Sequence, residues 1–144
     1  MPATGFDLAR FVSAQAPVIA DVFAELEAGR KRSHWMWFVF PQLRGLGHSA
    51  MARHYGITSV AEARAYLAHD VLGPRLHACC EVLLGLPATS AMEVFGMPDD
   101  LKLKSCMTLF AAAASSGEDK APFEQVLRRF YDGDRDARTL AMLV

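Results

Sequence analysis

The spacing of apolar residues restricts the fold of this chain more than any other feature. In most segments apolar residues recur at every third or fourth position, as on one face of a helix, and strand-like alternation is rare. Capping and helix-breaking residues divide the sequence into seven or eight such segments with short connections. We therefore predict an all-α fold. Residues 1–144 are expected to form a single compact domain of seven or eight short helices, packed as an irregular orthogonal bundle.

Residues that start and stop helices mark the predicted boundaries. Ser59 with Glu62, and Ser90 with Glu93, match the capping-box pattern of helix starts. The polar stretch from Ser115 to Lys120 is expected to be an exposed loop. The predicted helices are one capped by Asp7 that runs through Gln15, a stripe from Val18 to Leu26 that ends at Gly29, Ala63 to Ala68, Leu72 to Leu84, Ser90 to Gly96, Pro98 to Ala114, Pro122 to Tyr131, and a last one capped by Asp134 or Asp136.

Length and composition allow this fold without a covalent or metal staple. The chain has 144 residues, 52% of them apolar, and a domain of this length buries roughly 68–70% of the surface that its unfolded chain exposes. Cys79, Cys80 and Cys106 have neither metal-ligand nor redox spacing, which predicts buried reduced thiols. The first ten residues lack a signal-peptide pattern, and no apolar run approaches the roughly 20 residues that span a bilayer. We expect a cytoplasmic protein that uses no metal, cofactor or membrane.

One segment, from Arg30 to Gly56, does not follow the helical spacing. Trp35 to Phe40 are six consecutive large apolar residues, and neither a helix nor a strand can bury all six against one neighbour. Three interpretations remain open: a strut of the core, the wall of a ligand pocket, or part of a nucleic-acid surface. The pI near 6.5 and the small number of charges argue against nucleic acid.

Positive charge is concentrated in the same part of the chain. From Ala28 to Ala61 there is no Asp or Glu, whereas this window contains five Lys and Arg residues. The formal net charge of −1 is therefore the balance of +5 in the window and −6 in the rest of the chain. Such asymmetry is typical of a face that binds an anion or an acidic partner, although a basic loop that balances acidic helices would also produce it.

These features lead to a hypothesis about function. We expect a protein that binds a small anionic, ring-containing, nucleotide-like ligand and that, if it is an enzyme, is a metal-independent hydrolase. The ligand-binding residues expected are Trp35 and Trp37 as stacking walls, Lys31, Arg44 and Arg53 as anion contacts, and Gln15, Gln42 and Lys102 as further polar contacts. His34, beside the tryptophans, and Asp99, three residues before Lys102, are the candidate catalytic groups.

The alternative is a protein-interaction module whose basic and aromatic segment docks an acidic partner. In that case the aromatic rings would form a solvent-exposed patch instead of a concave wall, with Trp and Arg at its centre. The sequence does not determine the oligomeric state.

Several stretches together resemble a known bacterial family. They are the run from Ser33 to Leu43, SHWMWFVFPQL, with Gly45 to Gly47 and Tyr55 to Ile57 after it, and the matching stretches Phe11, Ala14–Gln15, Ala65 to Leu67, Leu72–Gly73, Arg75–Leu76, Phe95–Gly96, Asp99, Lys102–Leu103 and Met107 to Phe110. The chain resembles, over nearly its whole length, the family called domain of unknown function 1810. The resemblance implies a compact all-helical fold of about this length, and it implies no activity, substrate or cofactor.

Two predicted core positions offer a test of the helical stripes. Leu76→Ala and Phe110→Ala are each expected to lower the free energy of unfolding by roughly 2–5 kcal/mol, because each leaves a cavity in the core. Urea denaturation measures the change. If either variant unfolds at the same urea concentration as the parent chain, that stripe does not face the core.

Overall fold

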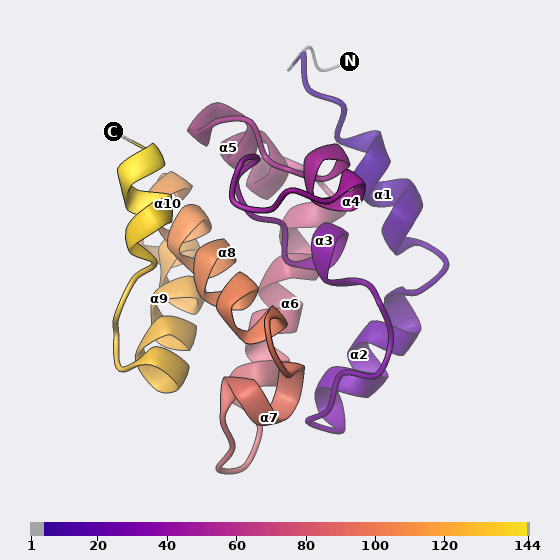
Figure 1. Cartoon of the computed structure of the whole chain (residues 1–144), viewed down its shortest axis with the longest axis vertical. Coiled ribbons are helices and arrows are strands. Elements are labelled where there is room, and N and C mark those ends of the chain that lie inside the picture. The colour runs from indigo at the N-terminus through magenta and orange to yellow at the C-terminus, as the bar shows by residue number, and fades with distance from the viewer. Residues whose placement is uncertain (1–4, 144) are drawn as a thin grey trace.

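A computed structural model describes residues 5–143, and these residues form ten α-helices and no strand (Figure 1). The helices are α1 (Ala9–Gln15), α2 (Ile19–Glu27), α3 (Met36–Val39), α4 (Ala50–His54), α5 (Val60–Ala68), α6 (Leu72–Leu84), α7 (Ala91–Phe95), α8 (Asp99–Ala113), α9 (Gly117–Tyr131) and α10 (Ala137–Met142). The all-α prediction is confirmed, and the described residues hold ten helices instead of seven or eight. The two that were missed, α3 and α4, both lie in the segment that broke the helical spacing, and each is too short to show a periodicity.

The helix starts agree with the sequence at most capped positions. The side chains of Ser59, Ser90 and Asp136 each accept a hydrogen bond from a backbone N–H in the first turn of α5, α7 and α10. The expected cap of the first helix is wrong, because α1 follows Leu8 and has no side-chain cap.

The expected loop from Ser115 to Lys120 is also wrong. α9 already begins at Gly117, and the side chain of Ser116 caps it by accepting from the backbone N–H of Asp119 at 3.1 Å. Two acidic residues in the first turn favour this start, because they interact well with the positive end of the helix dipole. A polar stretch that looks like a loop is here the start of a helix.

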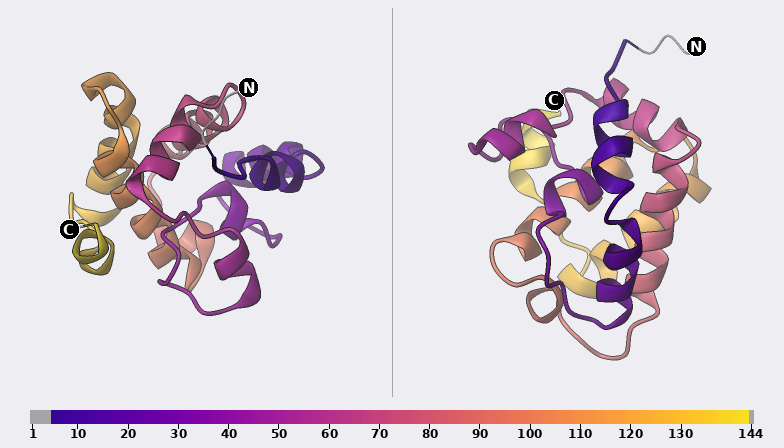
Figure 2. Two further views of the ribbon diagram at one scale, coloured as in Figure 1. Left: turned by 90° about the horizontal axis from the view of Figure 1, so that it is seen from above. Right: turned by 90° about the vertical axis from the view of Figure 1, so that its right-hand side faces the viewer.

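α6 lies at the centre of the molecule, and the other long helices pack around it (Figure 1). α2, α5 and α9 contact α6 directly, and α8 packs against both α5 and α9. Figure 2 shows α1 and α2 following one another along one side of the molecule, with α9 and α10 on the other. The short helices α3 and α4 lie between these two sides.

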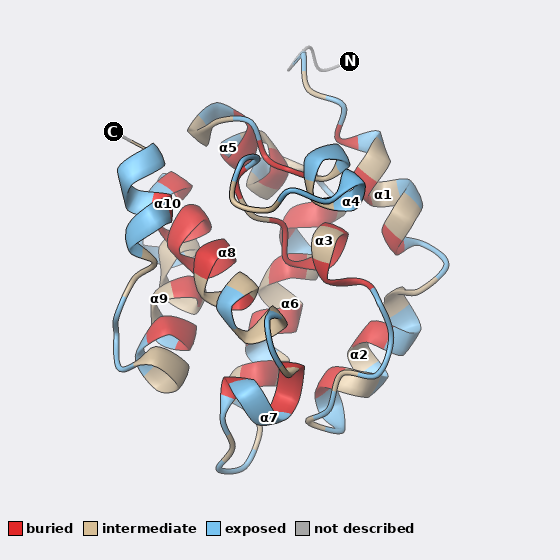
Figure 3. Cartoon of the chain, in the orientation of Figure 1, coloured by how far each residue is buried: buried red, intermediate tan, exposed pale blue. Residues whose placement is uncertain are grey.

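One continuous hydrophobic core extends through the described residues (Figure 3). Leu76 of α6 and Phe110 of α8 are buried in it, as the helical stripes predict. The three cysteines are reduced and buried, and burial raises the pKa of the Cys79 thiol to about 12. None of the ten helices in the described part of the chain is long and apolar enough to cross a bilayer.

The aromatic run belongs mainly to the core. Five of its six residues, all except Trp37, are buried, and the rings of Trp35 and Phe40 pack edge-on against Phe95 of α7. Because α3 is only one turn long, the run passes through the interior between helices, which enclose it on several sides. The exposed aromatic patch that an interaction module would need is therefore not formed by Trp35, Phe38 or Phe40.

A single carboxylate, that of Glu25 on α2, holds the chain just before this run. It accepts hydrogen bonds from the backbone N–H of Arg32 at 2.7 Å and of Ser33 at 2.9 Å, and from the Ser33 hydroxyl at 2.6 Å. The indole N–H of Trp35 donates to the same carboxylate at 3.0 Å. Partial burial raises the pKa of Glu25, but the hydrogen bonds from Ser33, Arg32 and Trp35 outweigh this effect and lower the pKa to about 2.

We expect the Glu25 contacts to make stability depend on pH. The pKa is about 2 in the folded chain and 4.5 without these contacts, so their contribution is complete above pH 4.5 and is lost as the pH falls towards 2. Glu25→Gln should lower the free energy of unfolding by about 1–3 kcal/mol at pH 7, the scale of one charged hydrogen bond, and by much less near pH 2.

Urea denaturation at the two pH values measures this dependence. The matched control is Glu27→Gln, which changes an exposed carboxylate on the same helix and should have little effect at either pH. A loss of equal size at both pH values for Glu25→Gln would show that the charge of Glu25 does not stabilise the fold.

Candidate functional site

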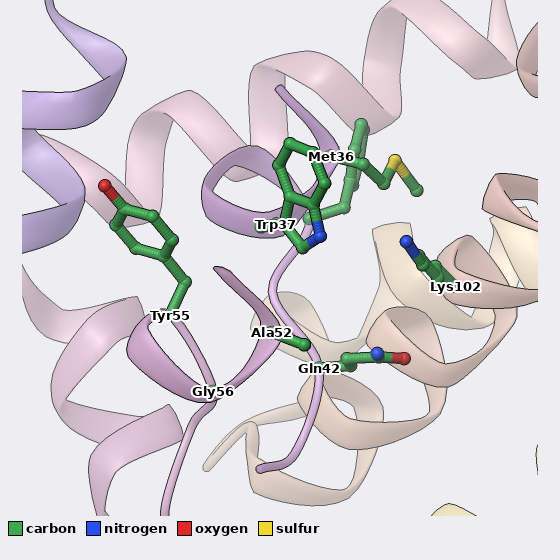
Figure 4. A pocket seen from close by; sticks show the side chains of 8 residues that line it. Met36, Trp37, Gln42, Ala52, Tyr55, Gly56 and Lys102 are labelled. Atoms are coloured by element: carbon green, nitrogen blue, oxygen red, sulfur yellow. The ribbon is translucent and has the colours of Figure 1, made fainter. Parts of the chain in front are cut away.

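A groove of about 320 Å³ lies between the loop that follows the aromatic run, the first turns of α8 and the start of α10. We call it the basic groove. The residues that line it are Gln42, Leu46, Gly47, Pro98, Leu101, Lys102, Lys104, Ser105, Asp136 and Arg138. Next to it lies a cavity of about 10 Å³, the inner cavity, lined by Met36, Trp37, Phe40, Gln42, Ala52, Tyr55, Gly56 and Lys102 (Figure 4). Gln42 and Lys102 line both spaces, so the two adjoin each other.

Backbone pairing fixes the loop that carries Gln42. The backbone N–H of Ile57 donates to the carbonyl of Gln42 at 2.9 Å, and the N–H of Arg44 donates to the carbonyl of Ile57 at 2.9 Å. This isolated bridge holds the loop against the segment that follows α4. Gly56 permits the close approach, because a Cβ there would lie 2.6 Å from the Cβ of Arg44.

Asp99 and two lysines form an ion-pair cluster at the end of the groove nearest Trp37. The Lys31 ammonium lies 2.9 Å from one carboxylate oxygen of Asp99, and the Lys102 ammonium lies 3.4 Å from the other. Lys102 also lies over the ring of Trp37, 5.4 Å from the ring centre. Because one carboxylate is shared by two ammonium groups, the cluster keeps a net positive charge.

Lys104, Arg138 and Asp136 supply the other charges that line the groove. Lys104 pairs with Asp134 at 2.7 Å, but the Asp134 side chain is 73% exposed, so water and salt weaken the pair. The guanidinium of Arg138 makes no hydrogen bond or ion pair within residues 5–143. The carboxylate of Asp136, which faces the groove, is occupied in capping α10 through the backbone N–H and hydroxyl of Thr139. Three cations therefore face the groove, and its one lining carboxylate is already hydrogen-bonded.

Three of the expected site residues meet here. Gln42 and Lys102 line the basic groove, and Trp37 lines the inner cavity. Lys31 and Asp99 are close by, but their charges are used in the ion-pair cluster.

The other expected residues lie elsewhere. Gln15 is buried, and its side-chain amide donates to the carbonyl of Phe38 and to the Tyr66 hydroxyl. Trp35 is also buried, and its indole N–H donates to the Glu25 carboxylate. Arg44 and Arg53 are exposed on the surface around α4, where the Arg44 Nε donates to the Arg53 carbonyl. Arg44 lines a separate, shallow hollow of about 390 Å³ with Arg10, His54 and Glu62. His34 is exposed and lines none of these three spaces.

Two cations of the groove were missed. Lys104 and Arg138 lie outside the acid-free window, and Arg138 is 36 positions away from Lys102. No local pattern in the sequence links residues so far apart. The spacing of Lys102 and Lys104 on a predicted helix was visible, but such pairs are usually part of a solvated face.

The arrangement of groups is suited to binding an anion. A general base needs a free carboxylate or imidazole within hydrogen-bond reach of the reacting group. Among the lining residues the only carboxylate, that of Asp136, is engaged as a helix cap, and no histidine is present. Within the described residues no group of three His, Cys, Asp or Glu side chains could hold a metal ion.

Comparison with known proteins gives a family and a close structural relative. The model of a family described as "Protein of unknown function (DUF1810)" matches residues 5–143. A conserved hypothetical protein from Mycobacterium tuberculosis has 57% sequence identity to this chain, and its crystal structure superposes with a TM-score of 0.93. The match covers 96% of this chain and 97% of that one. No curated protein matches the chain.

Gly47 gives a direct test of the packing at the groove. A Cβ at this position would lie 2.8 Å from the Cβ of Ala52 and 3.5 Å from the Gln42 amide nitrogen. Gly47→Ala should therefore force the loop away from α4 and lower the free energy of unfolding by about 1–3 kcal/mol.

The matched control is Gly85→Ala at the end of α6, where the added Cβ would make only ordinary contacts of 3.5 Å or more. This variant should unfold at nearly the same urea concentration as the parent chain. If both variants behave alike, the loop is not packed against α4 as described.

Proposed function

The chain belongs to the DUF1810 family, and we propose that this member binds a small anionic, ring-containing, nucleotide-like ligand in the basic groove, as a cytoplasmic protein. The single observation that carries the proposal is the meeting of Lys102, Lys104 and Arg138 at a groove whose only lining carboxylate is engaged. A positively charged, partly enclosed space raises the local concentration of anions and strengthens their ion pairs.

The size and the apolar surface of the groove agree with a ligand of this kind. Its volume of about 320 Å³ is at the lower end of the range for small-molecule sites. Leu46, Pro98 and Leu101 supply apolar contact area, and Leu101 is 56% exposed. Covering this surface with the ring of a ligand would remove it from water, which favours binding.

The ring is placed away from Trp37. The ammonium of Lys102 already covers the face of Trp37, and the inner cavity is too small for a ring. We therefore place the ring against Leu46 and Leu101 and the anionic group near Lys104 and Arg138. In this arrangement Trp37 contributes by holding Lys102 in position.

Binding without hydrolysis fits these residues better than catalysis. Hydrolysis would need a group that takes a proton from water, and the groove holds none in a free state. Asp99 is shared by two lysines, and His34 lies outside the groove.

A thermal-shift screen with nucleotides and sugar phosphates tests the proposed function. A ligand at about 100 times its Kd should stabilise the chain by roughly 2.7 kcal/mol. Arg138→Ala should weaken the binding of such a ligand about tenfold, because it removes one charge-assisted contact. Its own unfolding temperature should hardly change, since Arg138 is exposed.

Arg30→Ala serves as the matched control, because Arg30 is an exposed arginine beyond the end of α2 that does not line the groove. This variant should bind as the parent chain does. Equal losses in both variants, or no stabilising compound in the whole screen, would contradict binding in the basic groove.

A further inference from the structure

Three side chains with hydrogen-bond donors, those of Trp37, Gln42 and Lys102, line the inner cavity. In Figure 4 the indole nitrogen of Trp37, the ammonium of Lys102 and the amide of Gln42 lie around the same small space. The hydroxyl of Tyr55 points away from it, so that only the ring of Tyr55 contributes to the wall. None of the residues that line the cavity carries a carboxylate.

Two of these donors have no partner in the protein. Within residues 5–143 neither the indole N–H of Trp37 nor the side-chain amide of Gln42 makes a hydrogen bond. The other tryptophan differs, because the indole N–H of Trp35 donates to Glu25 at 3.0 Å. The chain therefore has one tryptophan N–H that anchors the fold and one that is available at the site.

The size of the cavity limits what can accept these hydrogen bonds. A volume of about 10 Å³ holds one water-sized atom, which is enough for a single oxygen and too little for a phosphate. The charge of Lys102 is partly balanced by Asp99, so the cavity does not require a full negative charge. A neutral carbonyl oxygen satisfies both conditions, because it is small and accepts more than one hydrogen bond.

We infer that the inner cavity is a subsite for a carbonyl oxygen on the ring of the ligand, recognised by Trp37, Gln42 and Lys102. This inference rests on the proposed function, since the ring must lie in the adjoining groove for its oxygen to reach the cavity. The subsite distinguishes ring compounds that carry an oxo group from those that lack it. An analogue without the oxygen leaves the donors without a ligand partner, which is the usual source of strong discrimination at a polar site.

Two nucleotides that differ at position 6 of the purine ring test the inference. Inosine 5′-monophosphate has an oxo group at C6 and a proton on N1, whereas purine riboside 5′-monophosphate has hydrogen at C6 and an unprotonated N1. We expect the first to bind at least about tenfold more tightly by isothermal titration calorimetry. Equal affinities would overturn the carbonyl subsite and leave binding in the groove intact. If neither compound binds while other nucleotides stabilise the chain, the subsite as described is also overturned.

The two indole N–H resonances provide an independent readout in a ¹⁵N-correlated NMR spectrum. On addition of inosine 5′-monophosphate the Trp37 indole signal should move, while the Trp35 signal stays in place as an internal control. If the Gly47 and Lys104 amide signals move and the Trp37 indole signal does not, the nucleotide binds in the groove without using the subsite. That result would overturn the carbonyl subsite and leave the proposed function intact. If none of these signals moves with any nucleotide of the screen, the proposed function fails as well.

Trp37→Phe removes the N–H and keeps an aromatic ring under Lys102. This variant should bind the two nucleotides with nearly equal affinity. Its affinity for purine riboside 5′-monophosphate should be the same as that of the parent chain. If Trp37→Phe does not fold, Gln42→Leu removes a second donor and should reduce the same preference. A full preference retained in a folded variant would overturn the assignment.

Discussion

The hydrogen bonds to the Glu25 carboxylate are the contacts on which the site depends most. They tie the chain before α3 to α2 and place the indole of Trp35 in the core. After this anchor the aromatic run enters the interior. Trp37 is the one residue of the run that stays half-buried, and it lies beside Lys102. The same anchor brings Lys31 to Asp99, which in turn holds Lys102. A structural contact on α2 thus supports the segment that carries Lys31 and Trp37 to the site.

The positive charge of the groove comes from the distribution of ion pairs around it and not from the net charge of the chain. The chain as a whole is almost neutral, with a formal net charge of −1. The carboxylates near the groove are nevertheless engaged: Asp99 with two lysines, Asp136 with the start of α10, and Asp134 with Lys104. Arg138 is left without a protein partner in the described residues. The residues that line the groove, with three cations and one carboxylate, thus carry a net positive charge in a nearly neutral protein.

The sequence allowed the long helices and their caps to be predicted, because a stripe of three or four turns and a Ser or Asp cap are local signals. It did not reveal α3 or α4, which are too short to show a period, or the Ser116 cap. Of the site residues predicted, Trp37, Gln42 and Lys102 line the inner cavity or the basic groove. The sequence could not place Arg138 at the groove, because only tertiary packing brings α10 to it.

A crystal structure of the chain with the most tightly bound nucleotide from the screen is the direct test of binding in the basic groove. We expect the ligand to lie in this groove, with its phosphate near Lys104 and Arg138 and its ring against Leu101. A ligand found instead in the hollow beside Arg44 and His54, with the basic groove empty, would contradict it.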